Sequence, residues 1–442
     1  MLARLTRGGA VVVPAALVGL GASALAAYAP LAGVAVLAAI VAGLLVLTRA
    51  EVLLLLLVGV QPWTDMLSFP TEAVSVVKLL GAILVIAWLL RVLARGEELR
   101  GSASIVAAAG FGLLVVLSLM ASPDPQEGIS KVLRYALYIT FAFLVLQLCD
   151  SPADVRRMIK VLVASTAAAA AYALVGFLSG VLPRAGGPIA EPNDFAFLLL
   201  LALCLSVYLL ARERHTRWLW SACFVAIGAA LLATLSRSAL VGLVAIVVWA
   251  LLSGHVRVDK LLATATAFAL VLVSALTLYP TLIHQRVAEK GRIADANAAA
   301  RVAYWSAAER MALDHPVLGV GPGRYRDETK HYLFNNPVAL ERPVAHNSYL
   351  EIAAESGAPA LLAFLAFLAF AWRDLRRARR EALAAREVDV VRLVTALQAA
   401  LVGTMVAGGF GSHQTEVGFW LLAGLAAALV GGPVRSQLAF SP

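Results

Sequence analysis

Long runs of apolar residues, interrupted by short polar breaks, recur along most of this chain. A helix needs about 20 apolar residues to cross the roughly 30 Å hydrocarbon core of a membrane, and many of these runs approach that length. They lack the alternation of polar and apolar residues that barrel strands show, so helices are expected. Hydrophobic residues form 61% of the chain and charged residues 14%, whereas a soluble domain has about 25% charged residues. The sequence therefore predicts an all-α polytopic membrane protein.

The polar breaks define about twelve to fourteen candidate spans, and the count is a range because the first three runs are short and closely spaced. The candidate spans are residues 8–27, 31–48, 51–64, 75–92, 103–120, 133–148, 159–180, 194–211, 217–234, 238–252, 260–279, 348–372, 391–411 and 416–431. The first run is also compatible with a cleavable signal peptide. Because further apolar runs follow at once, an uncleaved first helix is preferred.

The candidate spans and one long polar stretch between the later spans together suggest four parts of the chain. These are N-terminal transmembrane helices (1–130), transmembrane helices with arginine-bearing outer turns (131–279), an outer loop (280–345) and C-terminal transmembrane helices (346–442).

Basic residues indicate how the chain threads the membrane. With a cytoplasmic N-terminus, every strongly basic short connection falls on the cytoplasmic side, as the positive-inside rule requires. The formal charge of +9 then reflects topology, and the RRARR run is expected to be a solvated helix end instead of a nucleic-acid site. The connections carry Arg91, Arg95 and Arg100, then Arg156, Arg157 and Lys160, then Arg212, Arg214 and Arg217, then Arg257 and Lys260, then residues 373–392.

Several cations break this rule by lying on the outer side. Arg184 lies in LPRAGGPIAEPND and Arg237 in the tight turn TLSRSA. Either could merely reach a lipid headgroup, but the outer loop adds further cations, and their convergence predicts an anionic ligand at the outer surface. The loop cations are Arg286, Lys290, Arg292, Arg301, Arg310, Arg324, Arg326, Lys330 and Arg342.

The outer loop contains a predicted helix and a predicted set of turns. Residues 293–313 are free of Gly and Pro and rich in helix formers, and Arg301 and Trp305 share a helix face. In HPVLGVGPGR, Pro316 is expected to end the helix, and Gly319, Gly321 and Gly323 to supply turns. A phosphate-binding fingerprint is disfavoured because no strand precedes these glycines.

The chain re-enters the membrane at AHNSYLEIAAESG. His346 is expected at the outer interface, and Asn347 or Ser348 is expected to cap the new helix. No disulfide is predicted, because Cys149, Cys204 and Cys223 lie in or beside apolar runs. No metal site is predicted either, because the outer carboxylates of Glu191, Asp194, Asp327 and Glu328 are single or paired, and Asp194 is as compatible with a helix cap as with a ligand.

Four segments in order resemble the O-antigen ligase and O-antigen polymerase superfamily of bacterial envelope glycosyltransferases. They are PNDFA after Arg184, TLSRSALVG, RVAYWSAAERMALDHPVLGVGPG and HNSYLEIAAESG, and the resemblance spans about residues 130–430. It implies a GT-C-like architecture in the bacterial inner membrane, with residues 280–345 as a periplasmic loop.

The resemblance also implies a reaction and a site. The expected enzyme transfers a saccharide from undecaprenyl pyrophosphate to lipid A-core on the periplasmic face, without cofactor or metal, and with inversion. Arginines would stabilise the leaving pyrophosphate, and a neutral histidine would take the proton of the acceptor hydroxyl. The expected catalytic residues are His346, Arg301, Arg237 and Arg184, and the expected substrate contacts are Arg342, Arg286, Lys290, Arg292, Asn193, Asn347, Tyr304 and Trp305.

Three alternatives remain open. An O-antigen polymerase or a protein O-oligosaccharyltransferase would share these motifs, although the compact outer loop favours a ligase. A transporter of lipid-linked saccharides would also need many spans, but transporters commonly have internal repeats and charges near the bilayer midplane. The sequence has no such repeat, and its unusual charges lie at the outer interface.

Overall fold

The computed structural model describes residues 49–68, 75–254, 300–333 and 343–431. Its contacts divide the chain into two compact units, one comprising residues 1–57 with 78–99 and the other residues 58–77 with 100–442. In the described part of the smaller unit, Arg91 of α4 (Val76–Arg95) forms salt bridges with Glu97 at 2.9 Å and with Glu51 of α3 (Ala50–Val60). The larger unit contains all the other helices that the structure describes.

The described residues form helices without strands, apart from an isolated bridge between Ser68 and Ser75. The elements of the larger unit are η1 (Gln61–Trp63), α5 (Ala103–Ala121), α6 (Pro125–Leu148), α7 (Pro152–Leu178), α8 (Pro192–Arg212), α9 (Arg217–Ala233), α10 (Arg237–Leu252), α13 (Tyr325–Tyr332), α14 (Ser348–Ala384), α15 (Val388–Gly408) and α16 (Val417–Gly431).

Seven described helices, α4 to α8, α14 and α15, are long and apolar enough to cross a membrane, and four more apolar helices are shorter. The predicted all-α polytopic class is therefore confirmed. Eleven of the predicted spans coincide with described helices, within a few residues at most ends. The predicted spans 8–27, 31–48 and 260–279 lie outside the described residues, so the expected total of twelve to fourteen stays a prediction.

Proline and capping side chains determine where several helices begin. Pro125, Pro152 and Pro192 each occupy the first helical position, where the missing N–H costs no hydrogen bond. The preceding residues Asp124, Ser151 and Glu191 accept backbone N–H groups of the first turn through their side chains. Glu191, and not Asp194, caps α8.

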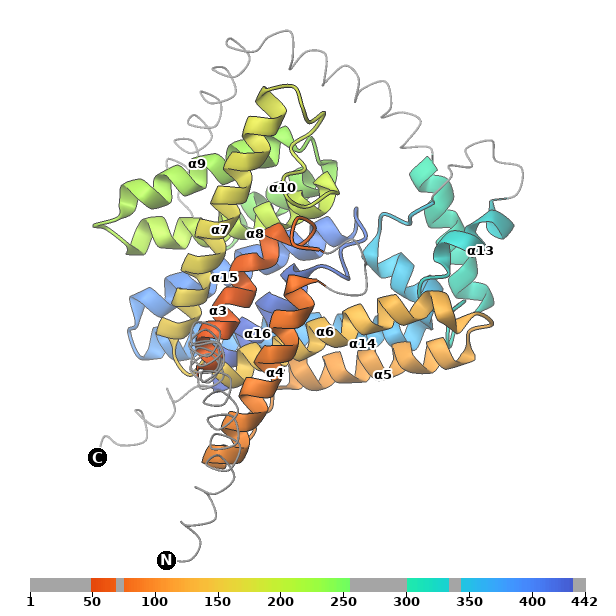
Figure 1. Ribbon diagram of the computed structural model, residues 1–442, viewed down its shortest axis with the longest axis horizontal. Helices are drawn as coiled ribbons and strands as arrows, with labels where there is room; N and C mark the ends of the chain where they lie inside the picture. Colours follow the sequence, from red (N-terminus) through yellow and green to blue (C-terminus); the bar gives the residue numbers. More distant parts are fainter. Residues whose placement is uncertain (1–48, 69–74, 255–299, 334–342, 432–442) are drawn as a thin grey trace, which may run out of the picture. The chain divides into compact units, whose positions relative to one another are not determined.

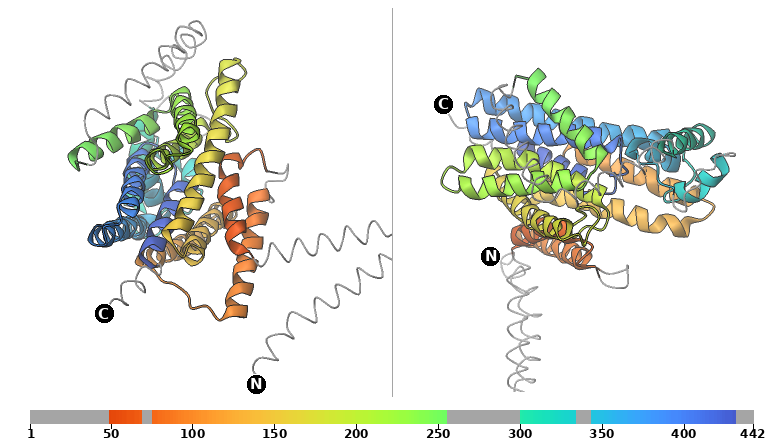
Figure 2. Two further views of the ribbon diagram at one scale, coloured as in Figure 1. Left: turned by 90° about the vertical axis from the view of Figure 1, so that its left-hand side faces the viewer. Right: turned by 90° about the horizontal axis from the view of Figure 1, so that it is seen from above.

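Helix α14 lies at the centre of the larger unit and packs against α5, α15 and α16 (Figures 1 and 2). Its Phe364 and Phe367 meet Trp420 of α16, with the rings of Phe367 and Trp420 stacked at 4.9 Å. Phe111 of α5 packs on Phe364 at 5.4 Å between ring centroids. These buried rings fix the middle of the bundle.

Helix α14 differs from the predicted span 348–372 in two ways. It continues to Ala384, and it is broken at Gly357, whose φ of 81° and ψ of 173° are not helical. Pro359 follows two residues later and cannot donate the backbone hydrogen bond that a continuous helix needs. The break separates a short arm, residues 348–356, from the long remainder of α14.

The glycine-rich loop of residues 315–324 satisfies the backbone groups that this break frees. The N–H groups of Val320 and Gly321 donate to the carbonyls of Ala354 and Glu355, both at 2.9 Å, and the N–H of Ala358 donates to Pro316 at 2.8 Å. An interrupted helix within a membrane is tolerated only with such partners. The predicted turn glycines Gly319, Gly321 and Gly323 all have positive φ, so the expected turns are confirmed.

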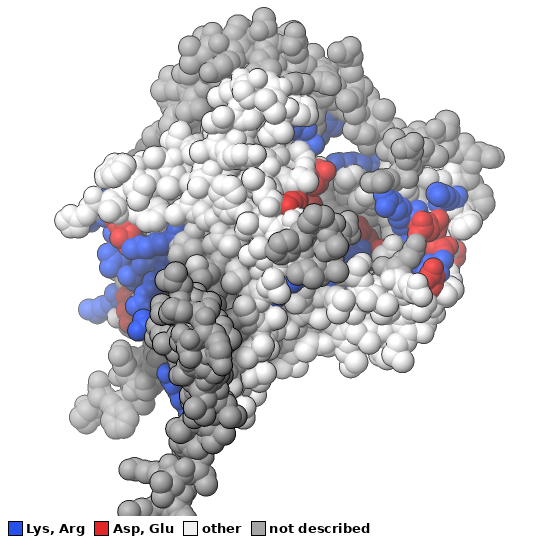
Figure 3. Space-filling model, in the orientation of Figure 1, with Lys and Arg blue, Asp and Glu red and all other residues white. Residues whose placement is uncertain are grey.

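Charged side chains of the larger unit gather at opposite ends of its helices. At one end, Asp389 of α15 accepts from Arg156 of α7 at 2.7 Å and from Arg212 of α8 at 3.0 Å. Arg184 lies before the other end of α8, about 30 Å away along a 21-residue helix. In Figure 3 charged atoms gather near the ends of α14 and α15 and again near α13, with mostly uncharged surface over α5 and α6.

We expect Gly357→Ala to destabilise the larger unit strongly. A Cβ at this position would lie 2.2 Å from the carbonyl oxygen of Val317, and its backbone conformation, which essentially only glycine adopts, adds about 1–3 kcal/mol of strain for any L-residue. Thermal unfolding of the detergent-purified protein, followed by size-exclusion chromatography of heated samples, measures the effect.

Gly180→Ala is the matched control, since Gly180 has φ of +77° but nothing within 4 Å of a Cβ. The control should lose only the strain contribution. Equal unfolding temperatures for the two variants would contradict the proposed fit between the loop and the break.

Candidate functional site

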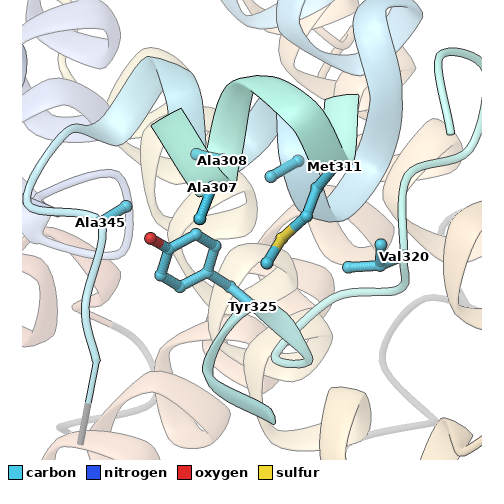
Figure 4. Close-up of a cluster of buried hydrophobic side chains, with 7 residues drawn as sticks. Ala307, Ala308, Met311, Val320, Tyr325 and Ala345 are labelled. Atoms are coloured by element: carbon cyan, nitrogen blue, oxygen red, sulfur yellow. The ribbon is translucent and has the colours of Figure 1, made fainter. Parts of the chain in front are cut away.

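The outer loop has a small apolar core of its own. Residues 300–314 are helical, which confirms the described part of the predicted helix 293–313. Tyr325 packs under this helix, and its hydroxyl donates to the carbonyl of Tyr304 at 2.8 Å. Figure 4 shows the core, which comprises Ala307, Ala308, Met311, Val320, Tyr325, Ala345 and Ala354. The core anchors the loop helix to the arm of α14 and to the segment that precedes His346.

Trp305 attaches the loop helix beside His346. Its indole Nε1 donates to the carbonyl of Ala345 at 2.9 Å, and its ring lies 6.1 Å from that of Phe410. Arg301 is one helical turn before Trp305 on the same face, which brings its side chain to the His346 segment. His346 adopts the left-handed backbone conformation with φ of 49°, immediately before the arm of α14 begins.

The other two predicted arginines are brought together by a pair of short connections. Arg184 donates from Nε to the carbonyl of Thr234 at 2.7 Å and from Nη2 to Oδ1 of Asn193 at 2.9 Å. The N–H of Ala185 donates to Ala233 at 3.1 Å. These bonds hold the turn between α9 and α10. Arg237 is the first residue of α10, and its side chain is exposed.

Electrostatics link Arg237, Arg301 and His346 into one site. Partial burial lowers the pKa of Arg301, and the positive charge of Arg237 lowers it further. Burial and then the charge of Arg301 lower the pKa of His346 to about 4, so its imidazole is neutral at pH 7. Neither arginine forms an ion pair with an acidic side chain among the residues that the structure describes. Within the described ranges, the site therefore presents two arginines without acidic partners beside a neutral histidine.

Three charged side chains of the same region were not foreseen from the sequence. Lys131 of α6 places Nζ 2.6 Å from Oε1 of Glu351 and 2.5 Å from Oε2 of Glu355, on the arm of α14. Glu351 is 7% exposed and Glu355 3% exposed. Ser412 and Gln414 also donate to Glu351, Gln414 at 2.7 Å. Two carboxylates thus share one ammonium group.

His413 also joins the region, although its sequence position suggests only a separate short connection. It is 1% exposed, its Nδ1 lies 3.0 Å from Oδ1 of Asp194, and its ring stacks on Phe197 at 4.4 Å. The His413 N–H donates to Oγ of Ser348 at 2.9 Å, so the turn is attached to the start of the arm. Asp194, ambiguous from sequence, is therefore the partner of a histidine.

A pocket lies beside Asp194 and Phe197, the two residues that contact the His413 ring. It is lined by Gln61, Thr64, Tyr138, Ile189, Asp194, Phe197, Leu198, Glu416, Val417 and Gly418. Burial and the nearby Asp194 raise the pKa of Glu416, while Arg134 opposes this shift. The pocket therefore brings the carboxyl groups of Asp194 and Glu416 close to each other.

Of the remaining residues predicted to contact substrate, some have structural roles in the described part of the chain and others lie outside it. Asn347 caps α14 as expected, and its Oδ1 accepts from the N–H groups of Tyr349 at 3.0 Å and Leu350 at 3.1 Å. Tyr304 is 2% exposed in the loop core. Contact of Asn193, Asn347, Tyr304 and Trp305 with substrate stays a prediction, and Arg286, Lys290, Arg292 and Arg342 lie outside the described residues.

A local signal for the missed acidic residues exists in the sequence. Glu351 and Glu355 are four residues apart in a predicted span and therefore share a helix face, and Lys131 precedes an apolar run directly. Charges at membrane depth are costly and indicate function by default. No comparable local signal connects His413 with Asp194, which lies 219 residues away.

Two comparisons bear on the family. Residues 222–365 match the family model described as O-antigen ligase, and this segment includes Arg237, Arg301 and His346 but not Arg184. A Pseudomonas aeruginosa protein named O-antigen ligase is 28% identical over 276 residues, which are 61% of this chain and 64% of that protein. The match thus covers less than two thirds of that relative. Together they confirm the resemblance to the O-antigen ligase superfamily.

We expect the His346 ring to titrate with a midpoint near pH 4 instead of the ordinary 6.5. Between these values the unfolded chain binds a proton that the folded protein does not, so His346 should make the protein less stable as pH falls. Histidine-labelled NMR measures the midpoint directly, with His346→Gln identifying the signal.

Arg301→Gln is the second variant for this experiment. It should raise the midpoint, because one cation is removed, but leave it below 6.5, because burial is the larger cause. A midpoint at 6.5 in the unmodified protein would exclude the buried setting of His346.

Proposed function

We propose that this chain, whose residues 222–365 are similar to O-antigen ligases, is a glycosyltransferase of the inner membrane. It takes a saccharide from undecaprenyl pyrophosphate and joins it to lipid A-core on the periplasmic face. The observation that carries the proposal is the convergence of Arg237, Arg301 and neutral His346 from three separate segments at one end of the bundle.

The unneutralised arginines suit the pyrophosphate of the donor. When the bond between the anomeric carbon and the phosphate oxygen breaks, its electron pair stays on the pyrophosphate, which becomes more negative. Guanidinium groups bind phosphate oxygens in bidentate fashion, and their fixed placement stabilises that charge as it develops. Arg237 and Arg301 are the proposed direct contacts. Arg184 contributes by holding the turn that carries Arg237, through its bonds to Thr234 and Asn193.

His346 suits the acceptor side of the reaction. The acceptor hydroxyl oxygen attacks the anomeric carbon and must lose its proton, which a neutral imidazole can accept. Attack opposite the leaving pyrophosphate inverts the anomeric centre. The lowered pKa of His346 keeps its imidazole unprotonated at neutral pH. The same low pKa makes the imidazole a weak base, so the imidazolium readily releases the proton again.

Transfer can be measured with purified protein, undecaprenyl-pyrophosphate-linked saccharide and lipid A-core. Formation of the joined product by the unmodified protein, and its loss in His346→Gln, is the expected result, because glutamine keeps hydrogen bonding but cannot take the proton. Growth of polymer on the lipid carrier, or transfer to protein, would assign the chain to the polymerase or the protein-glycosylating alternative.

We expect Arg237→Ala and Arg301→Ala each to lower kcat about 100-fold, the usual consequence of losing one preorganised donor to a developing anion. Lysine at either position should restore only part of the activity, because a point charge replaces a bidentate fork. Arg380→Ala, exposed in the basic part of α14, is the control and should keep full activity. Near-normal turnover of Arg301→Ala would remove that residue from the site.

We also expect turnover without a divalent metal. The arginines are proposed to supply the positive charge that a metal would, and Lys131 already occupies the space between Glu351 and Glu355. Activity should survive EDTA. A loss in EDTA that Mg²⁺ or Mn²⁺ reverses would contradict this part of the proposal.

The proposed orientation places α13 in the periplasm. Cysteine introduced at exposed Asp327 should react with a membrane-impermeant thiol reagent in intact spheroplasts, whereas cysteine at Arg380 should react only after permeabilisation. Background should be low, because Cys149, Cys204 and Cys223 are buried. The reverse pattern of labelling would invert the topology.

A further inference from the structure

The Lys131, Glu351 and Glu355 cluster, here called the acidic triad, has a charge that does not balance. Lys131 contributes one positive charge, and the two glutamates can contribute two negative charges. All three side chains lie in the helix bundle, where an uncompensated charge is costly. Adding one proton makes the triad neutral. The triad is thus a site that can hold one proton beyond its ion pairs.

The triad lies close to the proposed reaction. The N–H of Glu351 donates to the carbonyl of Asn347, the residue that follows His346, at 3.0 Å, and the charge of Glu351 acts on the His346 ring. Ser412 and Gln414, which donate to Glu351, flank His413. The titratable groups that face the two glutamates are Lys131 and Tyr135 of α6, Tyr325 of the outer loop, and His346.

The proposed reaction releases one proton that His346 cannot keep. The acceptor oxygen forms a bond to the anomeric carbon, the pyrophosphate leaves with the bonding electron pair, and the hydroxyl proton passes to the imidazole. With its pKa lowered to about 4, the imidazolium gives up this proton at neutral pH. The proton therefore passes to another acceptor before the next turnover.

Resting on the function proposed above, we propose that Glu351 and Glu355 of the acidic triad receive this proton from His346 and hold it until product leaves. The transfer neutralises both partners, because the imidazolium becomes imidazole and the triad loses its excess negative charge. Arg301 assists by disfavouring the imidazolium, and Lys131 keeps the proton from being bound before turnover. The glutamates act through His346 and do not contact the substrate.

Glu355→Gln separates this role from a structural one. The variant leaves Lys131 and Glu351 as a balanced ion pair, so a purely structural triad would keep its stability and its activity. If the triad instead accepts the proton from His346, Glu355→Gln would remove this function, because the balanced ion pair has no excess negative charge to neutralise. We expect an unfolding temperature equal to or above that of the unmodified protein, unchanged KM for donor and acceptor, and kcat lower by roughly tenfold or more.

The pH profile gives a second readout. The kcat of the unmodified protein should begin to fall at a pH above the protonation of His346 near pH 4, because the triad becomes protonated before turnover begins, and Glu355→Gln should keep only the fall that His346 causes. A normal kcat for Glu355→Gln, or a change in KM alone, would overturn the inference.

Infrared difference spectroscopy of the unmodified protein does not depend on any variant folding. On mixing with both substrates, a carbonyl band of a protonated carboxyl group should appear in the first turnover and shift when glutamate is labelled with ¹³C. Transfer without such a band overturns the inference and leaves the proposed function intact. Failure of the unmodified protein to transfer saccharide would overturn the proposed function itself.

Discussion

The break in α14 at Gly357 is the constraint on which the rest of the outer end depends. Backbone groups freed within an apolar bundle need partners, and here the loop of residues 315–324 and the Ser118 hydroxyl supply them. That requirement brings the loop down to the arm of α14, and the loop carries with it the helix that bears Arg301. The position of an arginine at the site is therefore fixed by the hydrogen-bonding needs of a different helix.

The site divides into a cationic and an acidic part at the mouth of α14. In the proposed mechanism, Arg237 and Arg301 bind the pyrophosphate, and the acidic triad receives the proton from His346. An anion and a proton would then be handled by different groups. Burial and the charge of Arg301 lower the pKa of His346, so the arginine proposed to bind the donor also keeps the proposed base unprotonated.

Local sequence signals predicted much of the fold. Apolar runs placed eleven described helices, glycine spacing placed the turns at residues 319–323, and the cap at Asn347 followed from its side chain. Arg184, Arg237 and Arg301 were singled out because they break the positive-inside rule, and His346 because it precedes the helix that re-enters the membrane and matches the family motif. The continuation of α14 to Ala384 agrees with the expectation that the RRARR run is a solvated helix end, whereas the break at Gly357 was not foreseen.

Long-range contacts account for what the sequence could not reveal. Lys131 meets Glu351 across 220 residues, and His413 meets Asp194 across 219 residues. Such pairs are set by how α6, α8, α14 and the turn before α16 pack together, and no spacing rule encodes that packing. Polar positions in apolar runs can be noticed in a sequence, but their partners cannot be assigned from it.

The contacts of the α14 arm also imply an order of biogenesis. Ser118 and the loop of residues 315–324 are synthesised before the arm, so its broken backbone can find partners as soon as it emerges. Ser412 and Gln414, in contrast, emerge only afterwards, and until then Glu351 lacks two of its hydrogen-bond donors. The arm would thus enter the bundle early, and Glu351 would gain its last hydrogen-bond donors only after residues 412–414 have been inserted.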